Sequence, residues 1–228
     1  LWSRRAQERE QRMRDAESRM AQARLAALQM QLNPHFLFNA LNALSALIHT
    51  DPDAADRMLG DLSELLRSAL ETSAEPEITL RRELEFLGRY LAVEQARFGD
   101  RLRVDQKVEP AVLDALVPTF ILQPLVENAV RHGIERSRQA GAIEVHARAE
   151  RDTLHLSIAD SGGAPLKAES SATGGSGRRV GLRNTQERLE QLYGERQSFT
   201  LTPREAGGMM AAISLPLVMK PVPEPASR

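Results

Sequence analysis

The histidine at position 35 is the first candidate catalytic residue along this chain. It follows Pro34 within Gln31–Asn39, at the predicted start of a helix, where its side chain would point into solvent. Neutral imidazole is a competent nucleophile near pH 7. Asn39, one turn later, is a candidate for orienting the imidazole ring. The alternative is a histidine that caps the helix or packs in a core.

A buried carboxylate is predicted at Asp160. This residue continues the apolar alternation of Leu154–Ile158, so its side chain points to the apolar side of a strand. A carboxylate there is costly unless donors meet it, and it could accept a hydrogen bond from the exocyclic amine of adenine. Gly162 and Gly163 follow and leave room for a flat ligand. The alternative is a strand-end aspartate that makes a turn.

Further polar residues gather around Asn128, which interrupts an apolar helix pattern although asparagine is a poor helix former. Its amide oxygen is a hard ligand suited to a Mg²⁺ ion that also contacts phosphates. Glu127 could orient water or support the hydration of the metal, and Arg131 and His132 could meet phosphate oxygens. The alternative is a solvated polar face.

Glycines then lead into a helix over residues 174–184, GGSGRRVGLRN. The N–H groups and dipole of a helix N-terminus can hold a phosphate. The sequence lacks the Gly-Lys-Ser/Thr of a Walker loop, and alone it would be a flexible loop. Together with Asn128 and Asp160 it completes candidate metal, adenine and phosphate functions, the phosphate candidates being Gly177, Arg178, Arg179, Gly181 and Leu182.

The N-terminal residues that precede these motifs are predicted to form a helical stalk. Positions 2, 6, 9, 13, 16, 20, 23, 27 and 30 follow heptad spacing and are apolar except for Arg9. A weak coiled coil over 1–30 is therefore expected, with a single solvated helix as the alternative. The start, Leu1–Arg5, is compatible with the cytoplasmic exit of a membrane helix outside this chain and equally with an arbitrary fragment end.

Three helices are predicted next. Asn33 and Pro34 provide an N-cap and a first helical residue, a second helix spans about 54–71, and a third spans about 80–98 and ends at Gly99. The first two form an antiparallel hairpin, whose apolar face cannot be buried alone, so a homodimeric four-helix bundle is expected. The first helix is predicted to carry an apolar stripe of Leu37, Leu41, Leu44 and Ile48, and the second to turn Met58, Leu62, Leu65, Leu66 and Ala69 inward.

From residue 101 the apolar period changes to that of strands. Strands are predicted around 102–108, 143–147, 154–158, 199–201 and 209–215, with helices after Pro124 and over about 182–193. The fold class is therefore α+β: a coiled-coil and helical-hairpin dimerisation region, then an α/β sandwich with helices on one face of a mixed sheet. The predicted divisions are 1–30 (stalk), 31–99 (helical region), 100–217 (α/β domain) and 218–228 (Pro-rich, disordered tail).

Composition narrows the function classes. The net charge of −1 over 228 residues gives no support for nucleic-acid binding. The absence of cysteine removes disulfides, thiolate metal sites and cysteine nucleophiles. No apolar run of about 18 residues is present to span a bilayer.

With these four motifs in order, the sequence resembles the sensor histidine kinases of the LytS/YehU type, whose catalytic domain has the GHKL ATP-binding fold. Gln31–Asn39 resembles the phosphoacceptor box, Pro124–Gly133 the N box, Asp160–Gly163 the first glycine box and Gly177–Asn184 the second. The resemblance extends from Gln29 to Leu217.

The resemblance implies a role for each motif. His35 would accept the γ-phosphoryl group of ATP and pass it to an aspartate of a response regulator with a receiver domain, of which a LytTR-type DNA-binding regulator is one candidate. Asn128 would ligate Mg²⁺, Asp160 would bind the adenine amine, and residues 162–180 would form the ATP lid. A homodimer at the cytoplasmic face of a bacterial cell membrane is implied, attached through a segment outside this chain and without direct nucleic-acid contact.

Two positions depart from the pattern of the family. Ala164 replaces a glycine of the first glycine box, and Arg179 replaces the middle glycine of the second. These departures motivate an alternative function, a catalytically degenerate scaffold that binds nucleotide or only dimerises.

Overall fold

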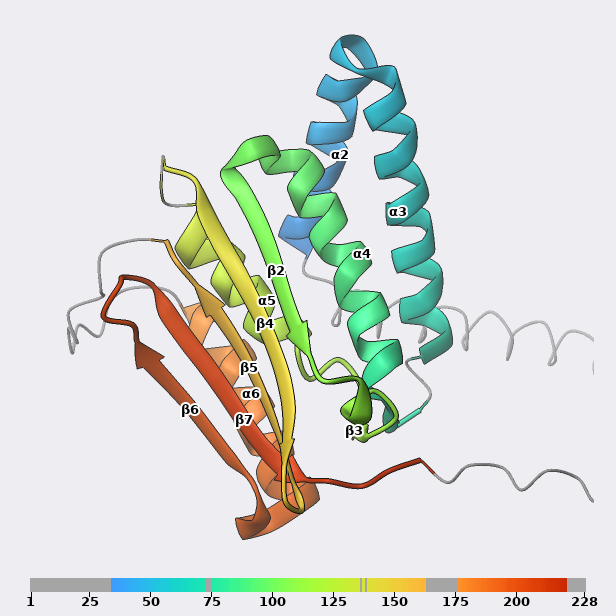
Figure 1. Cartoon of the computed structure of the whole chain (residues 1–228). Coiled ribbons are helices and arrows are strands. Elements are labelled where there is room, and N and C mark those ends of the chain that lie inside the picture. Colours follow the sequence, from blue (N-terminus) through green and yellow to red (C-terminus); the bar gives the residue numbers. More distant parts are fainter. Residues whose placement is uncertain (1–33, 73–74, 136, 138, 163–175, 221–228) are drawn as a thin grey trace, which may run out of the picture. The chain divides into compact units, whose positions relative to one another are not determined.

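The structure, a computed structural model, describes residues 34–72, 75–135, 137, 139–162 and 176–220, with the backbone alone for 176–180. Its contacts divide the chain into two units, Leu1–Ala74 and Glu75–Arg228 (Figure 1). The predicted stalk, the Asn33 cap and the end of the tail lie outside the described residues. Within the described ranges, no helix combines the length and apolar character that a bilayer crossing requires.

The first unit contains a helical hairpin, as predicted. Helix α2 (Pro34–Thr50) and helix α3 (Pro52–Thr72) run antiparallel and contact each other (Figure 1). Asp51 caps α3: its Oδ1 accepts a hydrogen bond from the backbone N–H of Ala54 at 2.9 Å. Each helix has proline at its first position, where no helical N–H is needed.

Within a single chain, the predicted apolar stripe of α2 is only partly covered. Phe36 and Ala40 are the buried residues, whereas Leu41 and Ile48 are 52% and 53% exposed. The spacing of Leu41 and Ile48 is helical, but sequence periodicity does not show which apolar face is covered. On α3 the prediction holds for Met58, Leu62, Leu65 and Ala69.

The second unit contains the predicted mixed sheet. Strands β2 and β4 pair in parallel and the other neighbours are antiparallel, in the order β2-β4-β5-β7-β6. A separate two-stranded sheet, β1 with β3, was not predicted. The strands are β1 (Glu77–Thr79), β2 (Leu102–Val108), β3 (Leu116–Pro118), β4 (Gly141–Glu150), β5 (Thr153–Asp160), β6 (Ser198–Pro203) and β7 (Met209–Pro216).

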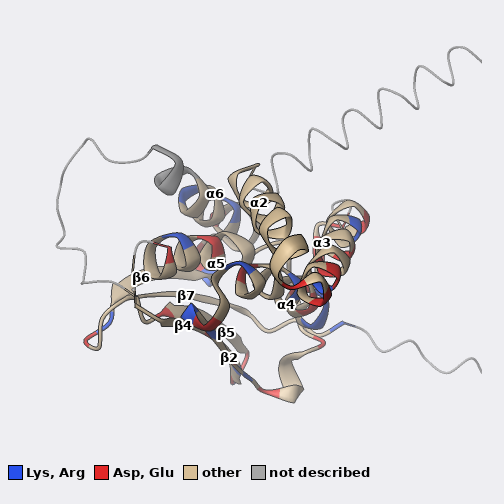
Figure 2. Ribbon diagram, turned by 90° about the horizontal axis from the view of Figure 1, so that it is seen from above, with Lys and Arg blue, Asp and Glu red and all other residues tan. Residues whose placement is uncertain are grey.

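Helices of the second unit cover one face of its sheet (Figure 2). They are α4 (Leu80–Phe98), α5 (Gln123–Ala129), which continues as the π-helical segment Val130–Ile134, and α6 (Ser176–Tyr193). The core between these layers includes Ile143 of β4, Leu156 of β5 and Ile213 of β7, each at most 1% exposed. The predicted α/β sandwich is therefore confirmed.

Helix α4 has the predicted ends, but it belongs to the second unit, whereas the sequence placed it in the helical region 31–99. Its N-cap Thr79 lies in β1, which pairs with β3. The backbone N–H groups of Leu80 and Arg81 donate to the carbonyls of Ala115 and Leu113. These bonds fix the start of α4 to the α/β unit.

Helix α6 begins at Ser176, earlier than the predicted start at Leu182. It therefore includes Gly177 and Gly181, which were expected in a loop. Glycine costs only about 1 kcal/mol in a helix interior, and the Thr185 hydroxyl donates to the Gly181 carbonyl at 3.0 Å within the helix.

Candidate functional site

Asp160 is a buried carboxylate at the end of β5, 3% exposed, as its alternation predicted. Its Oδ1 accepts from the backbone N–H of Gly162 and its Oδ2 from that of Met209, both at 3.2 Å. Burial raises the pKa of this carboxyl, and the two N–H donors and the nearby Arg204 oppose that shift. These donors partly offset the desolvation of a carboxylate at this position.

Three glycines surround Asp160. A Cβ on Gly133 would lie 2.5 Å from Asp160 Oδ1, and one on Gly208, at φ +82°, would lie 2.1 Å from the Asp160 carbonyl oxygen. A Cβ on Gly162 would lie 1.7 Å from the Gly133 carbonyl oxygen. Since no side chain fits at these positions, the backbone of three segments can approach one carboxylate. Gly133 and Gly162 belong to the predicted motifs, but Gly208 was missed.

The candidate metal and phosphate residues lie on α5 and the segment after it. Asn128 and Glu127 are partly exposed on α5, and the Gln123 side-chain amide donates to Glu127 at 2.8 Å. Arg131 and His132 lie in the π-helical turn, a distortion that is frequent at functional sites. Helix α5 packs against β5 and α6, so Asn128 and Asp160 belong to neighbouring elements of one unit.

An amide oxygen such as that of Asn128 suits Mg²⁺, which is commonly bound through one or two protein ligands, waters and substrate phosphates. Within the described residues no group of three His, Asp or Glu could hold a metal by itself. The Asn128 amide therefore fits a metal that is also bound by water and by substrate phosphates.

The candidate phosphate residues of the second glycine box occur at the start of α6. Gly177, Arg178 and Arg179 are in its first turn, where the structure gives the backbone, and Gly181 and Leu182 are partly exposed in the next turn. Gly163 lies outside the described residues. The predicted role of this segment in phosphate binding stays a prediction.

His35 is exposed at the start of α2, in the first unit. The amide nitrogen of Asn39 lies 3.3 Å from both ring nitrogens of His35. This contact fits the predicted role of Asn39 in orienting the ring. His35 and the candidate nucleotide residues belong to different units of the chain.

Sequence reasoning missed residues that hold the site. Arg204 donates to the Asp160 carbonyl oxygen and to Glu144, at 3.2 and 3.0 Å. Glu83 of α4 is 1% exposed, and its carboxylate accepts hydrogen bonds from backbone N–H groups of the turn before α5. The sequence contained one signal for the close approach of Gly208 to Asp160, namely the pair Gly207–Gly208 before an alternating strand. It contained none for Arg204 and Glu83, because the pattern around each of them indicates a solvent-facing residue.

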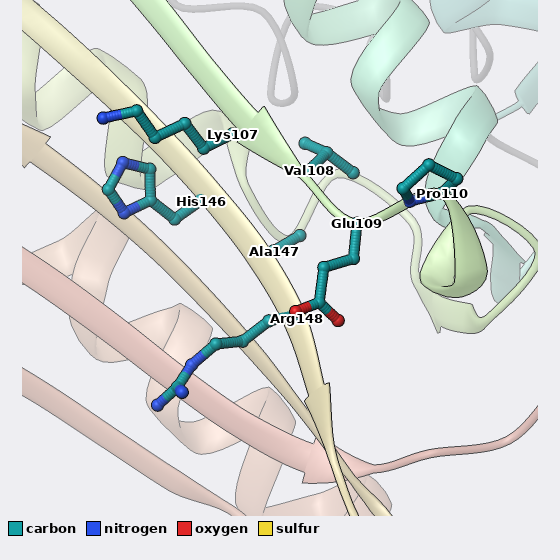
Figure 3. A pocket seen from close by; sticks show the side chains of 7 residues that line it. All are labelled: Lys107, Val108, Glu109, Pro110, His146, Ala147 and Arg148. Carbon is teal, nitrogen blue, oxygen red and sulfur yellow. The ribbon is translucent and has the colours of Figure 1, made fainter.

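A separate pocket of about 430 Å³ lies beside β2 and β4 (Figure 3). Its charged side chains have local partners: Lys107 pairs with Asp105 at 3.3 Å, and Arg148 with Glu150 at 3.6 Å. No residue predicted for adenine, metal or phosphate lines this pocket, whose lining is Lys107, Val108, Glu109, Pro110, His146, Ala147 and Arg148.

The second unit thus has the fold and the motif positions of a histidine-kinase-type ATPase domain. Two sequence-family models match: "Histidine kinase" over residues 23–102, and "Histidine kinase-, DNA gyrase B-, and HSP90-like ATPase" over residues 114–219. The chain belongs to the histidine kinase family.

Individual relatives agree with this assignment. The chain is 36% identical to the sensor protein LytS of Staphylococcus haemolyticus, over 81% of this chain and 33% of that protein. It is 38% identical to the sensor histidine kinase YpdA of Escherichia coli, over 76% of this chain and 31% of that protein. The chain spans about a third of the length of the curated relatives it matches.

Solved structures of histidine kinases also align with the chain. The Acinetobacter baumannii histidine kinase AdeS aligns with a TM-score of 0.48 at 13% identity, covering 87% of this chain and 97% of that one. The catalytic domain of histidine kinase ThkA aligns with a TM-score of 0.47 at 18% identity, covering 63% of this chain and 97% of that one.

Proposed function

We propose that this chain is the kinase core of a two-component sensor histidine kinase, which transfers the γ-phosphoryl group of ATP to His35. The observation that carries this proposal is the buried Asp160 carboxylate, approached by the backbone of Gly133, Gly162 and Gly208 and neighboured by the Asn128 helix. A buried carboxylate that is closely surrounded by backbone can recognise a flat base by accepting a hydrogen bond from the exocyclic amine of that base. Membership of the histidine kinase family supports the same assignment.

The nucleotide roles divide between the sheet and the helices. Asp160, with Gly162 and Gly163, binds adenine, and Asn128 holds Mg²⁺, whose charge offsets the charge that develops on the phosphates. Glu127 supports the hydration of the metal. The triphosphate is bound by Arg131 and His132 and by the start of α6, through Gly177, Arg178, Arg179, Gly181 and Leu182.

The transfer step requires a neutral His35 imidazole. Its unprotonated ring nitrogen donates its lone pair to the γ-phosphorus, while the bond from that phosphorus to the β–γ bridging oxygen breaks and ADP leaves with the electron pair. The other ring nitrogen then loses its proton to solvent. The Asn39 amide can orient the ring before the reaction. Its N–H cannot stay hydrogen-bonded to the attacking nitrogen, because the lone pair that would accept this hydrogen bond is the one that attacks phosphorus.

The partners of the kinase core follow from the same proposal. The phosphoryl group passes from His35 to an aspartate of a receiver domain, and a LytTR-type regulator is one candidate. A second copy of the chain covers the apolar residues that are exposed on α2 and α3, completing a four-helix bundle. These residues are Phe38, Leu41 and Ile48 on α2 and Leu59 and Leu70 on α3.

The division of the chain is part of the proposal. Residues 1–30 form the signalling stalk, 31–99 the helical and phosphotransfer region, 100–217 the catalytic domain and 218–228 the tail, with the reservation that α4 packs within the second unit. Location at the cytoplasmic face of a bacterial membrane, through a segment outside this chain, stays a prediction.

Incubation with γ-labelled ATP and Mg²⁺ tests the proposed function. We expect label that is stable in base and labile in acid, and its loss in His35→Gln. His49→Gln is the matched control, because His49 is also exposed and lies near the other end of α2. Wild-type labelling of His35→Gln would contradict the assignment. Binding of an ATP analogue with no labelling of the wild type would favour the degenerate scaffold.

A further inference from the structure

A buried glutamate holds the turn that leads into the Asn128 helix. Glu83 lies in the first turn of α4 and is 1% exposed. Its two carboxylate oxygens accept from the backbone N–H groups of Phe120 and Leu122, each at 2.9 Å. Phe120 has φ +58°, in the left-handed region that a phenylalanine rarely adopts. Glu83 thus stabilises an unfavourable turn directly before α5.

The same turn is tied to α6 through Arg188. This guanidinium donates to the carbonyl oxygens of Thr119 and Pro76. Its positive charge also acts on the Glu83 carboxylate. Three elements therefore meet here: α4, the turn before α5, and the helix that contains the second glycine box.

The other end of the Asn128 segment is fixed separately. Arg97 of α4 pairs with Glu94 at 3.0 Å and with Glu135, the residue after the π-helical turn. Gly133 approaches Asp160 so closely that a Cβ would not fit. Asn128 lies between a start held by Glu83 and an end held against the adenine carboxylate.

We propose that Glu83 is a positioning residue for Mg²⁺-bound nucleotide, which sets Asn128 by fixing the start of α5 and, with Arg188, the orientation of α5 relative to α6. This inference rests on the proposed function. Loss of Glu83 should release the start of α5 while its end stays at Asp160. The Mg²⁺-dependent part of nucleotide binding should then fall, and the adenine-dependent part should remain.

The substitution Glu83→Gln separates these two parts. A glutamine amide nitrogen cannot accept a hydrogen bond, so one of the two N–H groups loses its acceptor. Binding of the non-hydrolysable analogue AMP-PNP is measured by calorimetry with Mg²⁺ and with EDTA. We expect affinity with Mg²⁺ to fall by about tenfold and affinity in EDTA to change by less than about twofold. The matched control is Glu85→Gln, an exposed glutamate of the same helix.

Hydrogen exchange of the nucleotide-free protein gives a second readout that does not depend on ATP. In Glu83→Gln, amides of residues 119–128 should exchange about tenfold faster, whereas those of 130–135, β5 and β7 should match the wild type. Arg188→Met, which changes a partly exposed residue on the other side of the turn, should accelerate the same region. It keeps the test informative if Glu83→Gln does not fold.

Unchanged exchange over 119–128 in both variants would overturn the proposal. So would equal losses of affinity with and without Mg²⁺, or faster exchange throughout the unit, since either would indicate a merely structural role. If the wild-type chain binds no nucleotide, the proposed function fails, and exchange alone then decides whether Glu83 braces α5.

Discussion

At the scale of single residues, the environment of Asp160 depends on the absence of side chains. Gly133 is the most informative position, because a Cβ there would lie 2.5 Å from Asp160 Oδ1, well inside contact distance. A methyl group cannot be accommodated unless the carboxylate or the π-helical turn moves. The chemistry of Asp160 is therefore coupled to the identity of a residue 27 positions earlier in the sequence.

Gly133→Ala tests this coupling. We expect the free energy of unfolding to fall by about 1–3 kcal/mol, as for other overpacked sites, and AMP-PNP affinity to fall by about tenfold or more. Denaturant unfolding and calorimetry measure the two effects. Gly88→Ala is the control: nothing lies within 4 Å of its Cβ position in α4, so alanine should be neutral or stabilising by up to about 1 kcal/mol. Normal affinity in Gly133→Ala would contradict the proposed crowding.

Glu83 predicts a pH dependence of stability. Burial raises its pKa from 4.5 to about 7, against its two backbone hydrogen bonds and the charge of Arg188. Between these pH values the folded state keeps a proton that the unfolded state has lost, so stability falls as pH rises from about 4.5 to about 7 and is then constant. The contribution of this group is at most about 3 kcal/mol.

The comparison with Glu83→Gln isolates this contribution. Glutamine does not titrate, and its lost acceptor adds a cost that does not vary with pH. We expect the stability advantage of the wild type over Glu83→Gln to shrink by about 1–3 kcal/mol between pH 5 and pH 8. Urea unfolding followed by tyrosine fluorescence suits this measurement, because the chain has two tyrosines, Tyr90 and Tyr193, and both lie in the second unit. A constant difference would show that Glu83 titrates normally.

At the scale of elements, α4 is joined to the Asn128 segment at both ends by acidic and arginine side chains. At its C-terminal end Glu94 is 2% exposed and shares Arg97 with Glu135. Burial raises the pKa of Glu94, and Arg97 lowers it. Removal of the arginine leaves a buried carboxylate without its cation.

We therefore expect Arg97→Gln to lower the free energy of unfolding by about 3 kcal/mol at neutral pH, in the range found when one partner of a buried pair is removed. The control is Arg81→Gln, which breaks the exposed pair with Asp114, whose side chains are 49% and 60% exposed; its cost should stay below about 1 kcal/mol. Equal effects of the two substitutions in urea unfolding would show that burial of the Glu94 pair adds nothing.

The elements also show what sequence can predict. The ends of α4 were predictable because Leu80, Leu84, Leu87 and Leu91 form a stripe and Gly99 ends it at φ +58°. Glu83 was not, since an acid beside that stripe reads as solvent-facing. Its burial results from tertiary packing of the turn before α5, which no local pattern reports.

The candidate site divides in the same way. Asp160 was predictable because strand alternation places its side chain on the core side, and Asn128 because it interrupts an apolar helix. The start of α6 was not predictable. Glycines at 177 and 181 indicate a loop, whereas the backbone is helical there. Gly208 and Arg204 escaped because their role depends on the pairing of β5 with β7.

At the scale of the whole molecule, the proposed acceptor residue and the proposed nucleotide-binding residues belong to different units. His35 lies in the unit Leu1–Ala74. Asp160 and Asn128 lie in Glu75–Arg228, as do Glu83 and Arg97, the two α4 residues that hold the Asn128 segment. The second unit has its own sheet, its own helices and its own core. Nucleotide binding should therefore be a property of this unit alone, and phosphoryl transfer a property of the chain.

A fragment of residues 75–228 tests that division. We expect it to bind AMP-PNP and Mg²⁺ within about twofold of the full chain, and to take no label from γ-labelled ATP because it lacks His35. The full chain with His35→Gln should behave identically in both assays, since the substitution leaves every second-unit contact in place. Affinity reduced by more than about tenfold in the fragment, with normal affinity in His35→Gln, would show that the first unit contributes to the nucleotide site. In that case Glu83 and Arg97 of α4 would be only part of what positions Asn128.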